Sequence, residues 1–190
     1  MPARNDTVLE FLKTRRSRPA KTLQAPGPSR GELEELLTIA ARVPDHGKLE
    51  PWRFIVIEGD AMRQTAEAAN KAAQAAGFNA EKTAKASAQF EQGICAVAVI
   101  MSPVLSEKVP KIEQIYSAGA VCHNLVAAAL AAGWGANWLS GAISHDRGFA
   151  EGALGLTPHE NIAGFIHIAT ETNRPPERPR PDMKAKTTWA

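Results

Sequence analysis

The stretch Arg42-Val-Pro-Asp-His-Gly-Lys-Leu-Glu-Pro-Trp52 leads from a helical pattern into a strand pattern with little chain between them. Ser29 and Glu32 before it have the spacing of a capping box, and the leucines that follow recur at helical spacing, so we predict a helix over 29–43. The β-branched and aromatic residues after the stretch predict a strand over 53–58. The connecting loop carries more charge than a turn requires, in Arg42, Asp45, His46, Lys48 and Glu50. Functional residues are common on such loops.

Helical patterns also occupy other parts of the chain. Asp6 is the predicted N-cap of the first helix, and Gly77 separates two helices made mainly of strong helix formers. The longest helix is Ala-rich and apolar on most sides, so we expect it to be buried, and Gly133 and Gly135 are expected to end it. The predicted helices cover 6–14, the two parts of 60–90, 110–132, and a short segment from Asp146 to near Gly155.

Three more segments have strand patterns. The run 94–101 is short and continuously apolar, which is typical of a strand buried on both faces. Residues 137–140 predict a weak strand, and 162–169 predict the last clear one. Helices interleaved with four short strands most simply form a three-layer α/β sandwich, and we expect a single domain over residues 1–190.

The C-terminal residues 173–190 differ from the rest of the chain. Prolines at 175, 176, 179 and 181 prevent regular structure, and yet the segment ends on the apolar Trp189. Two interpretations follow: a disordered terminus, or an extension that packs against another surface.

Composition narrows the class of protein. The chain has 190 residues, of which 44% are hydrophobic, enough for one domain with a sizeable core. The net charge of +2 is spread along the sequence, so no basic stripe indicates nucleic-acid binding. No apolar run could cross a bilayer and the first residues lack a signal-peptide core, so we expect a cytoplasmic protein without a membrane partner. Cys95 and Cys122 lie in apolar segments and are expected to be buried thiols.

Motifs of several other enzyme classes are incomplete. Gly133-Trp-Gly135 follows a helix and lacks the third glycine of a dinucleotide fingerprint. Gly47-Lys48 lacks the upstream glycine of a P-loop, since position 42 is arginine. The histidines show no metal-ligand spacing, and Ser140 lacks the preceding glycine of a nucleophile elbow. We therefore expect neither a metal site nor hydrolase chemistry.

The loop at 42–52 resembles the Ala-Pro-Ser-x-x-Asn-x-Gln-Pro-Trp signature of the flavin-dependent nitroreductase family, in the Pro-Asp-His form of its small bacterial branch. Arg15-Arg16-Ser17 is similar to the family's phosphate-binding triplet, and Trp138-Leu139-Ser140-Gly141 falls where the family contacts the flavin ring. The resemblance extends along nearly the whole chain. It implies an α+β, nitroreductase-like fold with a mixed central sheet surrounded by helices. It also implies a domain-swapped homodimer in which each C-terminal extension, residues 173–190, crosses the partner.

The resemblance also implies which residues bind flavin mononucleotide (FMN). Arg15, Arg16 and Ser17 would clamp the phosphate, although taken alone the triplet is more typical of a solvated helix end. His46, taken alone, is a surface loop histidine, and Lys48 equally suits solvent or the flavin's carbonyl edge. The sequence departs from the family pattern at Lys48, Glu50 and Leu139, where Asn, Gln and Arg are usual. The other implied contacts are Arg42, His46, Lys48, Trp138, Leu139, Ser140 and Arg180, the last preferred to Arg174 and Arg178.

The implied activity is that of an FMN-dependent oxidoreductase that uses NAD(P)H to reduce nitroaromatic, quinone or other electron-poor small molecules by a ping-pong mechanism. No side chain need act as a nucleophile, because the cofactor carries the chemistry. One alternative is a flavin-binding or storage protein without turnover. Another is an enzyme of the same fold that acts on a small aldehyde or enone or that fragments the flavin. The sequence leaves open the acceptor and the choice between NADH and NADPH.

Overall fold

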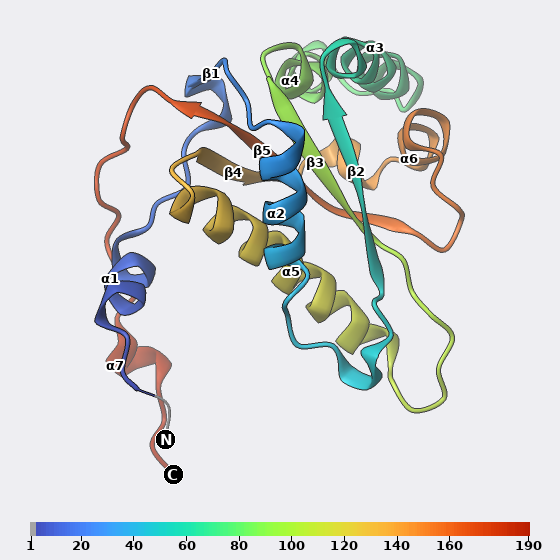
Figure 1. Cartoon of the computed structure of the whole chain (residues 1–190). Helices are drawn as coiled ribbons and strands as arrows, with labels where there is room; N and C mark the ends of the chain where they lie inside the picture. The colour runs from blue at the N-terminus through green and yellow to red at the C-terminus, as the bar shows by residue number, and fades with distance from the viewer. Residues whose placement is uncertain (1–2) are drawn as a thin grey trace.

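An antiparallel sheet of five strands organises the computed structural model, which describes residues 3–190 (Figure 1). The strands are β1 (Leu23–Gln24), β2 (Trp52–Glu58), β3 (Cys95–Met101), β4 (Gly135–Leu139) and β5 (Asn161–Glu171). β5 pairs with β1, β3 and β4, and β3 also pairs with β2. The long β5 therefore joins the sheet together.

The α+β class is confirmed, but the predicted mixed sheet is wrong for this part of the chain, because every strand pair in it is antiparallel. The connection between β2 and β3 explains one of these pairs. It consists of two packed helices, α3 (Asp60–Ala75) and α4 (Ala80–Glu91). They return the chain to the end of the sheet where β2 finishes, so β3 runs back with Cys95 opposite Glu58.

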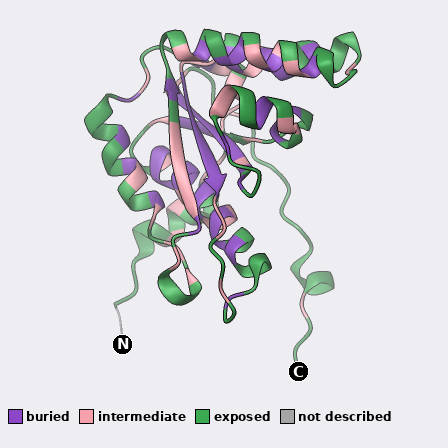
Figure 2. Cartoon of the chain, turned by 90° about the vertical axis from the view of Figure 1, so that its right-hand side faces the viewer, coloured by how far each residue is buried: buried purple, intermediate pink, exposed green. Residues whose placement is uncertain are grey.

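Helices cover both faces of the sheet (Figure 1). α3, α4 and α6 (Arg147–Leu154) pack on one face, and α2 (Arg30–Ala40) and α5 (Lys111–Ala131) pack on the other. Alternate residues of β3 point into the two cores, and all seven are buried, as predicted for a strand covered on both faces. Figure 2 shows this burial concentrated in the strands and the inner faces of the helices.

The predicted helices are present with small differences at their ends. Asn5, rather than Asp6, caps α1 (Asp6–Thr14), because its side chain accepts the Val8 amide at 3.1 Å. The capping box of α2 is confirmed, with Ser29 and Glu32 bonded reciprocally. α2 ends at Ala40, before the predicted position 43, and Asn124 of α5 holds this end by donating to the Ile39 carbonyl at 2.7 Å.

Two short elements and one glycine differ from the predictions. β1 and α7 (Met183–Lys186) are too short to give a sequence pattern. Gly133, with φ of 90°, follows the end of α5 as predicted, but Gly135 begins β4. A Cβ at Gly135 would lie 2.4 Å from Leu23 Cδ2, so this glycine permits close strand packing.

The terminal helices α1 and α7 lie away from the sheet (Figure 1). None of the α1 residues is buried, and the C-terminal segment contacts the end of α1, since Arg180 donates to the Lys13 carbonyl at 2.6 Å. Trp189 is 92% exposed. Among residues 3–190, no helix combines the length and apolarity needed to span a bilayer.

An ion pair between the buried Glu160 and the partly exposed Arg53 should make stability depend on acidic pH. Arg53 of β2 forms two hydrogen bonds, at 2.6 and 2.9 Å, to the Glu160 carboxylate, and these hold the pKa of Glu160 at about 2, below its ordinary value of 4.5. Because the folded pKa is depressed, its stabilisation is present above pH 4.5 and is lost as pH falls toward 2. Arg53 is partly exposed, so we expect a loss of about 1–2 kcal/mol.

Urea titrations of the wild type and of Glu160→Gln at several pH values measure this contribution. The variant should be less stable at pH 7 and should lose less stability between pH 4.5 and 2. The same pH dependence in both proteins would contradict the assignment.

Candidate functional site

A pocket with four arginines lies at the end of α1 and the C-terminal end of α5. Its volume is about 270 Å³, and its lining includes Trp134 and Glu171. We call it the arginine pocket; its cationic residues are Arg15, Arg16, Arg18 and Arg174. The surplus of cations over the one carboxylate makes it suited to an anion.

The pocket's shape is held by Arg18. Its backbone amide donates to the Ala136 carbonyl of β4 at 2.8 Å, and its Nε lies 2.7 Å from a carboxylate oxygen of Glu171. Arg16 donates to the Pro176 carbonyl. Within residues 3–190, no hydrogen bond or ion pair engages the guanidinium groups of Arg15 and Arg174. These two cations are therefore available to a ligand.

Arg15 also acts on a neighbouring titratable group. The pKa of His123, on α5, is lowered from 6.5 first by burial and then by the positive charge of Arg15. Arg15 therefore lies close enough to α5 for its charge to act on His123.

The predicted phosphate contacts are only partly brought together. Arg15 and Arg16 line the arginine pocket, whereas Ser17 is exposed beside it. Arg180 lies outside the pocket, because its guanidinium donates to Lys13 and pairs with Glu177 at 3.1 Å. Arg174 lines the pocket, whereas the family resemblance favours Arg180 for the second phosphate contact.

Trp138 and Leu139 form the end of β4, and Ser140 follows it. The Trp138 indole lies over Gly164 of β5, since a Cβ there would be 1.9 Å from Nε1, and Nε1 donates to the Ala163 carbonyl at 3.3 Å. Trp138 is 39% exposed, Leu139 is partly buried and Ser140 is exposed. Because Arg18 bonds to Ala136 of the same strand, this edge adjoins the arginine pocket.

The loop at 42–50 has an unusual backbone. Lys48 and Glu50 have φ of 53° and 48°, left-handed values that cost a non-glycine residue about 1–2 kcal/mol. The Asp45 carboxylate accepts the amides of Leu49 at 3.3 Å and of Glu50 at 2.7 Å, which holds this conformation. His46 Nδ1 lies 2.6 Å from Glu113 Oε2 of α5, and the Arg42 and Lys48 side chains are exposed.

The three parts of the predicted site do not meet within one chain. The arginine pocket and the β4 edge lie at the C-terminal end of α5, whereas His46 of the loop contacts Glu113 near its N-terminal end and the Arg42 carbonyl contacts Asn124 farther along the helix. The 21 residues of α5 span about 30 Å. Figure 1 shows the same separation, with α1 on one side of the molecule and the loop below α2 on another.

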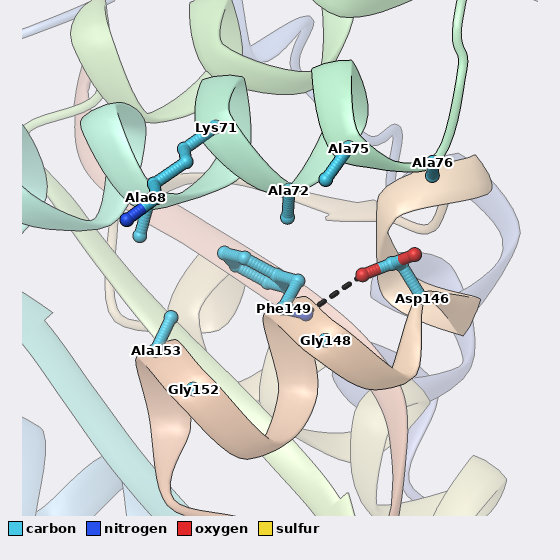
Figure 3. Close-up of a pocket in the computed structure, with 10 residues that line it drawn as sticks. All are labelled: Ala68, Lys71, Ala72, Ala75, Ala76, Asp146, Gly148, Phe149, Gly152 and Ala153. Atoms are coloured by element: carbon cyan, nitrogen blue, oxygen red, sulfur yellow. Dashed lines mark hydrogen bonds between the residues drawn. The ribbon is translucent and has the colours of Figure 1, made fainter.

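A larger cavity lies elsewhere, between α3 and α6 (Figure 3). Its volume is about 550 Å³, and alanine and glycine form most of its wall. The Asp146 carboxylate at its rim is already bonded to the Phe149 amide at 2.7 Å, which leaves Lys71 to supply polar contacts. The cavity shares no residue with the predicted site, and its lining does not suit a phosphate-bearing cofactor.

Other reactive groups are not assembled into a site. Burial raises the pKa of both Cys95 and Cys122 to about 12, so neither is a thiolate at neutral pH. In the part of the chain that the structure describes, no three His, Cys, Asp or Glu side chains cluster as a metal site requires.

Sequence comparisons all find relatives of one family. The profile described as "Nitroreductase family" matches residues 12–170. "Putative NAD(P)H nitroreductase YdjA" of Escherichia coli strain K12 is 33% identical over 181 residues, which cover 95% of this chain and 91% of the relative. A Haemophilus influenzae protein with the name "Putative NAD(P)H nitroreductase" is 32% identical over 165 residues, with coverage of 86% and 88%.

Solved structures share the fold. The nitroreductase-like family protein from Bacillus cereus has a TM-score of 0.83 at 24% identity and covers 100% of this chain and 98% of its own. A nitroreductase homologue from Desulfovibrio desulfuricans, solved in complex with FMN, has a TM-score of 0.73 at 20% identity and covers 96% of both chains.

Proposed function

Because this chain belongs to the nitroreductase family, we propose that it is an FMN-dependent oxidoreductase that reduces nitroaromatic, quinone or other electron-poor acceptors with NAD(P)H. The observation that carries the proposal is the arginine pocket, whose two uncompensated guanidinium groups suit a phosphate dianion. The FMN complex of the Desulfovibrio desulfuricans neighbour supports the choice of cofactor.

The residues present fit this cofactor. Arg15 and Arg174 would hold the phosphate, Arg16 and Ser17 would border it, and the β4 edge from Trp138 would face the ring. Arg42, His46 and Lys48 would approach from a second side, and the Lys48 ammonium would favour negative charge on the ring's carbonyl edge. When bound, the flavin supplies the hydride chemistry. The protein would bind and orient the flavin and neutralise its charge.

The absorbance spectrum of the purified protein tests this proposal. We expect the two visible bands of oxidised flavin, which should bleach within seconds when NADH or NADPH is added anaerobically. A flavin that stays yellow would instead favour a storage protein. A colourless protein that binds no added FMN would overturn the proposal.

We propose that the complete site forms only in a homodimer. The loop at 42–50 and the arginine pocket are apart in one chain, so a second copy is needed to bring a loop to each pocket. Exposed apolar side chains on α1 and the first half of α5 supply a surface for that contact; they are Val8, Leu12, Ile112, Ile115 and Tyr116. The two unpaired cysteines fit a reducing, cytoplasmic compartment.

Shortening the tail should weaken the dimer. Light scattering of the full chain should give twice 20.4 kDa, and deleting residues 181–190 should lower this mass, because Met183 and the exposed Trp189 would no longer cover the partner. This deletion retains Arg174, so a loss of flavin would follow from dissociation. A full-length protein that is monomeric and still binds flavin would contradict the proposed dimer.

Steady-state kinetics should be of the ping-pong type. Donor and acceptor are expected to occupy one site in turn, because the sequence carries no separate dinucleotide-binding motif. Double-reciprocal plots with NADH or NADPH and a quinone should give parallel lines. Intersecting lines would show that both substrates bind together.

A further inference from the structure

Two side chains of α5 contact the loop at 42–50: Asn124 donates to the Arg42 carbonyl at 3.3 Å, and Glu113 contacts the His46 ring. His46 Nδ1 and Glu113 Oε2 are 2.6 Å apart, a short distance typical of hydrogen bonds to a charged group. The two residues are 67 positions apart in the sequence, so the contact is a tertiary one. It fixes the imidazole relative to α5, the longest helix of the described residues.

The other edge of the same ring is open. The His46 side chain is 60% exposed, and no described residue bonds to Nε2. Because a carboxylate accepts and cannot donate, the contact requires the proton of a neutral His46 ring to sit on Nδ1. Nε2 is then an acceptor that points away from Glu113.

The backbone around His46 is also held in place. Asp45 bonds to two amides farther along the loop, while Lys48 and Glu50 keep left-handed conformations. Strain of this kind persists only where the surroundings determine the conformation, and it is concentrated at ligand sites. The loop is therefore preorganised before any ligand arrives.

We propose that Glu113 is a positioning residue for the cofactor site: it fixes the tautomer and direction of His46, so that Nε2 accepts a hydrogen bond from a flavin donor, a ribityl hydroxyl or the ring N3–H. This inference rests on the proposed function, because it needs a bound flavin. Glu113 itself does not touch the cofactor. Its effect on flavin must pass through His46.

Nitrogen NMR of the imidazoles in the flavin-free protein provides a readout that a purely structural role would not change. In its neutral form the His46 ring should carry its proton on Nδ1, and Glu113→Leu should abolish this preference. The spectrum of His46→Ala identifies the His46 signals. Glu107→Leu, on the exposed loop before α5, is the matched control and should leave the His46 signals unchanged.

A double-mutant cycle on the FMN dissociation constant tests whether the effect of Glu113 on FMN binding passes through His46. Glu113→Leu and His46→Ala should each weaken FMN binding about two- to tenfold, the range for one neutral hydrogen bond. Adding Glu113→Leu to His46→Ala should have no further effect. Equal effects of Glu113→Leu in both backgrounds, or a His46 proton on Nε2 in the wild type, would overturn the inference.

The two proposals fail in different ways. Wild-type protein that binds no FMN would overturn the proposed function and this inference together. Wild-type protein that binds FMN with an affinity unchanged by Glu113→Leu would overturn this inference alone.

Discussion

Replacing Arg15 with alanine is expected to give a colourless protein with an unchanged fold. The Arg15 guanidinium has no partner among residues 3–190, so its loss should remove a phosphate contact without breaking an internal one. A charge-assisted hydrogen bond contributes about 1.5–3 kcal/mol, which corresponds to about a ten- to hundredfold loss of FMN affinity. Flavin absorbance after gel filtration and a titration of flavin-free protein measure it.

Matched arginine variants decide which C-terminal residue completes the clamp. Arg174→Ala should lower affinity to a similar extent, whereas Arg180→Ala should have a smaller effect, because Arg180 is engaged with Lys13 and Glu177. Arg30→Ala on α2, in an exposed pair with Glu34, is the control. Full retention of flavin by Arg15→Ala would exclude the arginine pocket as the phosphate site.

The individual helices and strands could be predicted because the sequence patterns that indicate them involve only neighbouring residues. The capping box at Ser29, the break at Gly77 and the continuous apolar run of β3 each depend on nearby residues only. Strand order and direction depend on contacts between distant segments. The prediction of a mixed sheet was based on the family resemblance. In the structure, the helical pair α3–α4 connects β2 to β3 so that the two strands are antiparallel.

The residues of the candidate site likewise form two groups: those that a sequence motif indicates and those whose roles depend on distant contacts. Motif resemblance led to Arg15, the loop at 42–50 and the end of β4, because these segments have recognisable sequences. It did not lead to Arg18 or Glu113, whose roles arise from contacts with Glu171 and His46. The ranking of Arg180 over Arg174 likewise could not be settled by sequence, because the proline-rich tail gives no pattern for its path.

His167 of β5 is a polar side chain buried in the core without hydrogen-bond partners among the described residues. Its side chain is 1% exposed, it packs beside Phe90, and neither ring nitrogen has a hydrogen-bond partner among the described residues. A Cβ at Gly93 would lie 3.2 Å from Nδ1, so the neighbouring backbone is close on that side. Burial lowers the pKa of His167 to about 4.

The protein should therefore lose stability in mildly acidic solution. The folded pKa of His167, about 4, is below its ordinary value of 6.5, so between these values the unfolded chain binds a proton that the folded protein does not. The contribution of His167 to stability is greatest above pH 6.5 and falls as pH drops toward 4, by about 3 kcal/mol. Urea titrations at half-unit steps of pH measure the slope.

His167→Leu should remove this slope, because leucine has a similar volume and does not titrate. It should also raise stability at pH 7, by up to about 1–3 kcal/mol, since two buried polar atoms without partners are lost. His159→Gln replaces an exposed histidine and should keep the wild-type curve. If His167→Leu loses as much stability between pH 6.5 and 4 as the wild type, the acid sensitivity comes from other groups and His167 has a partner in solution.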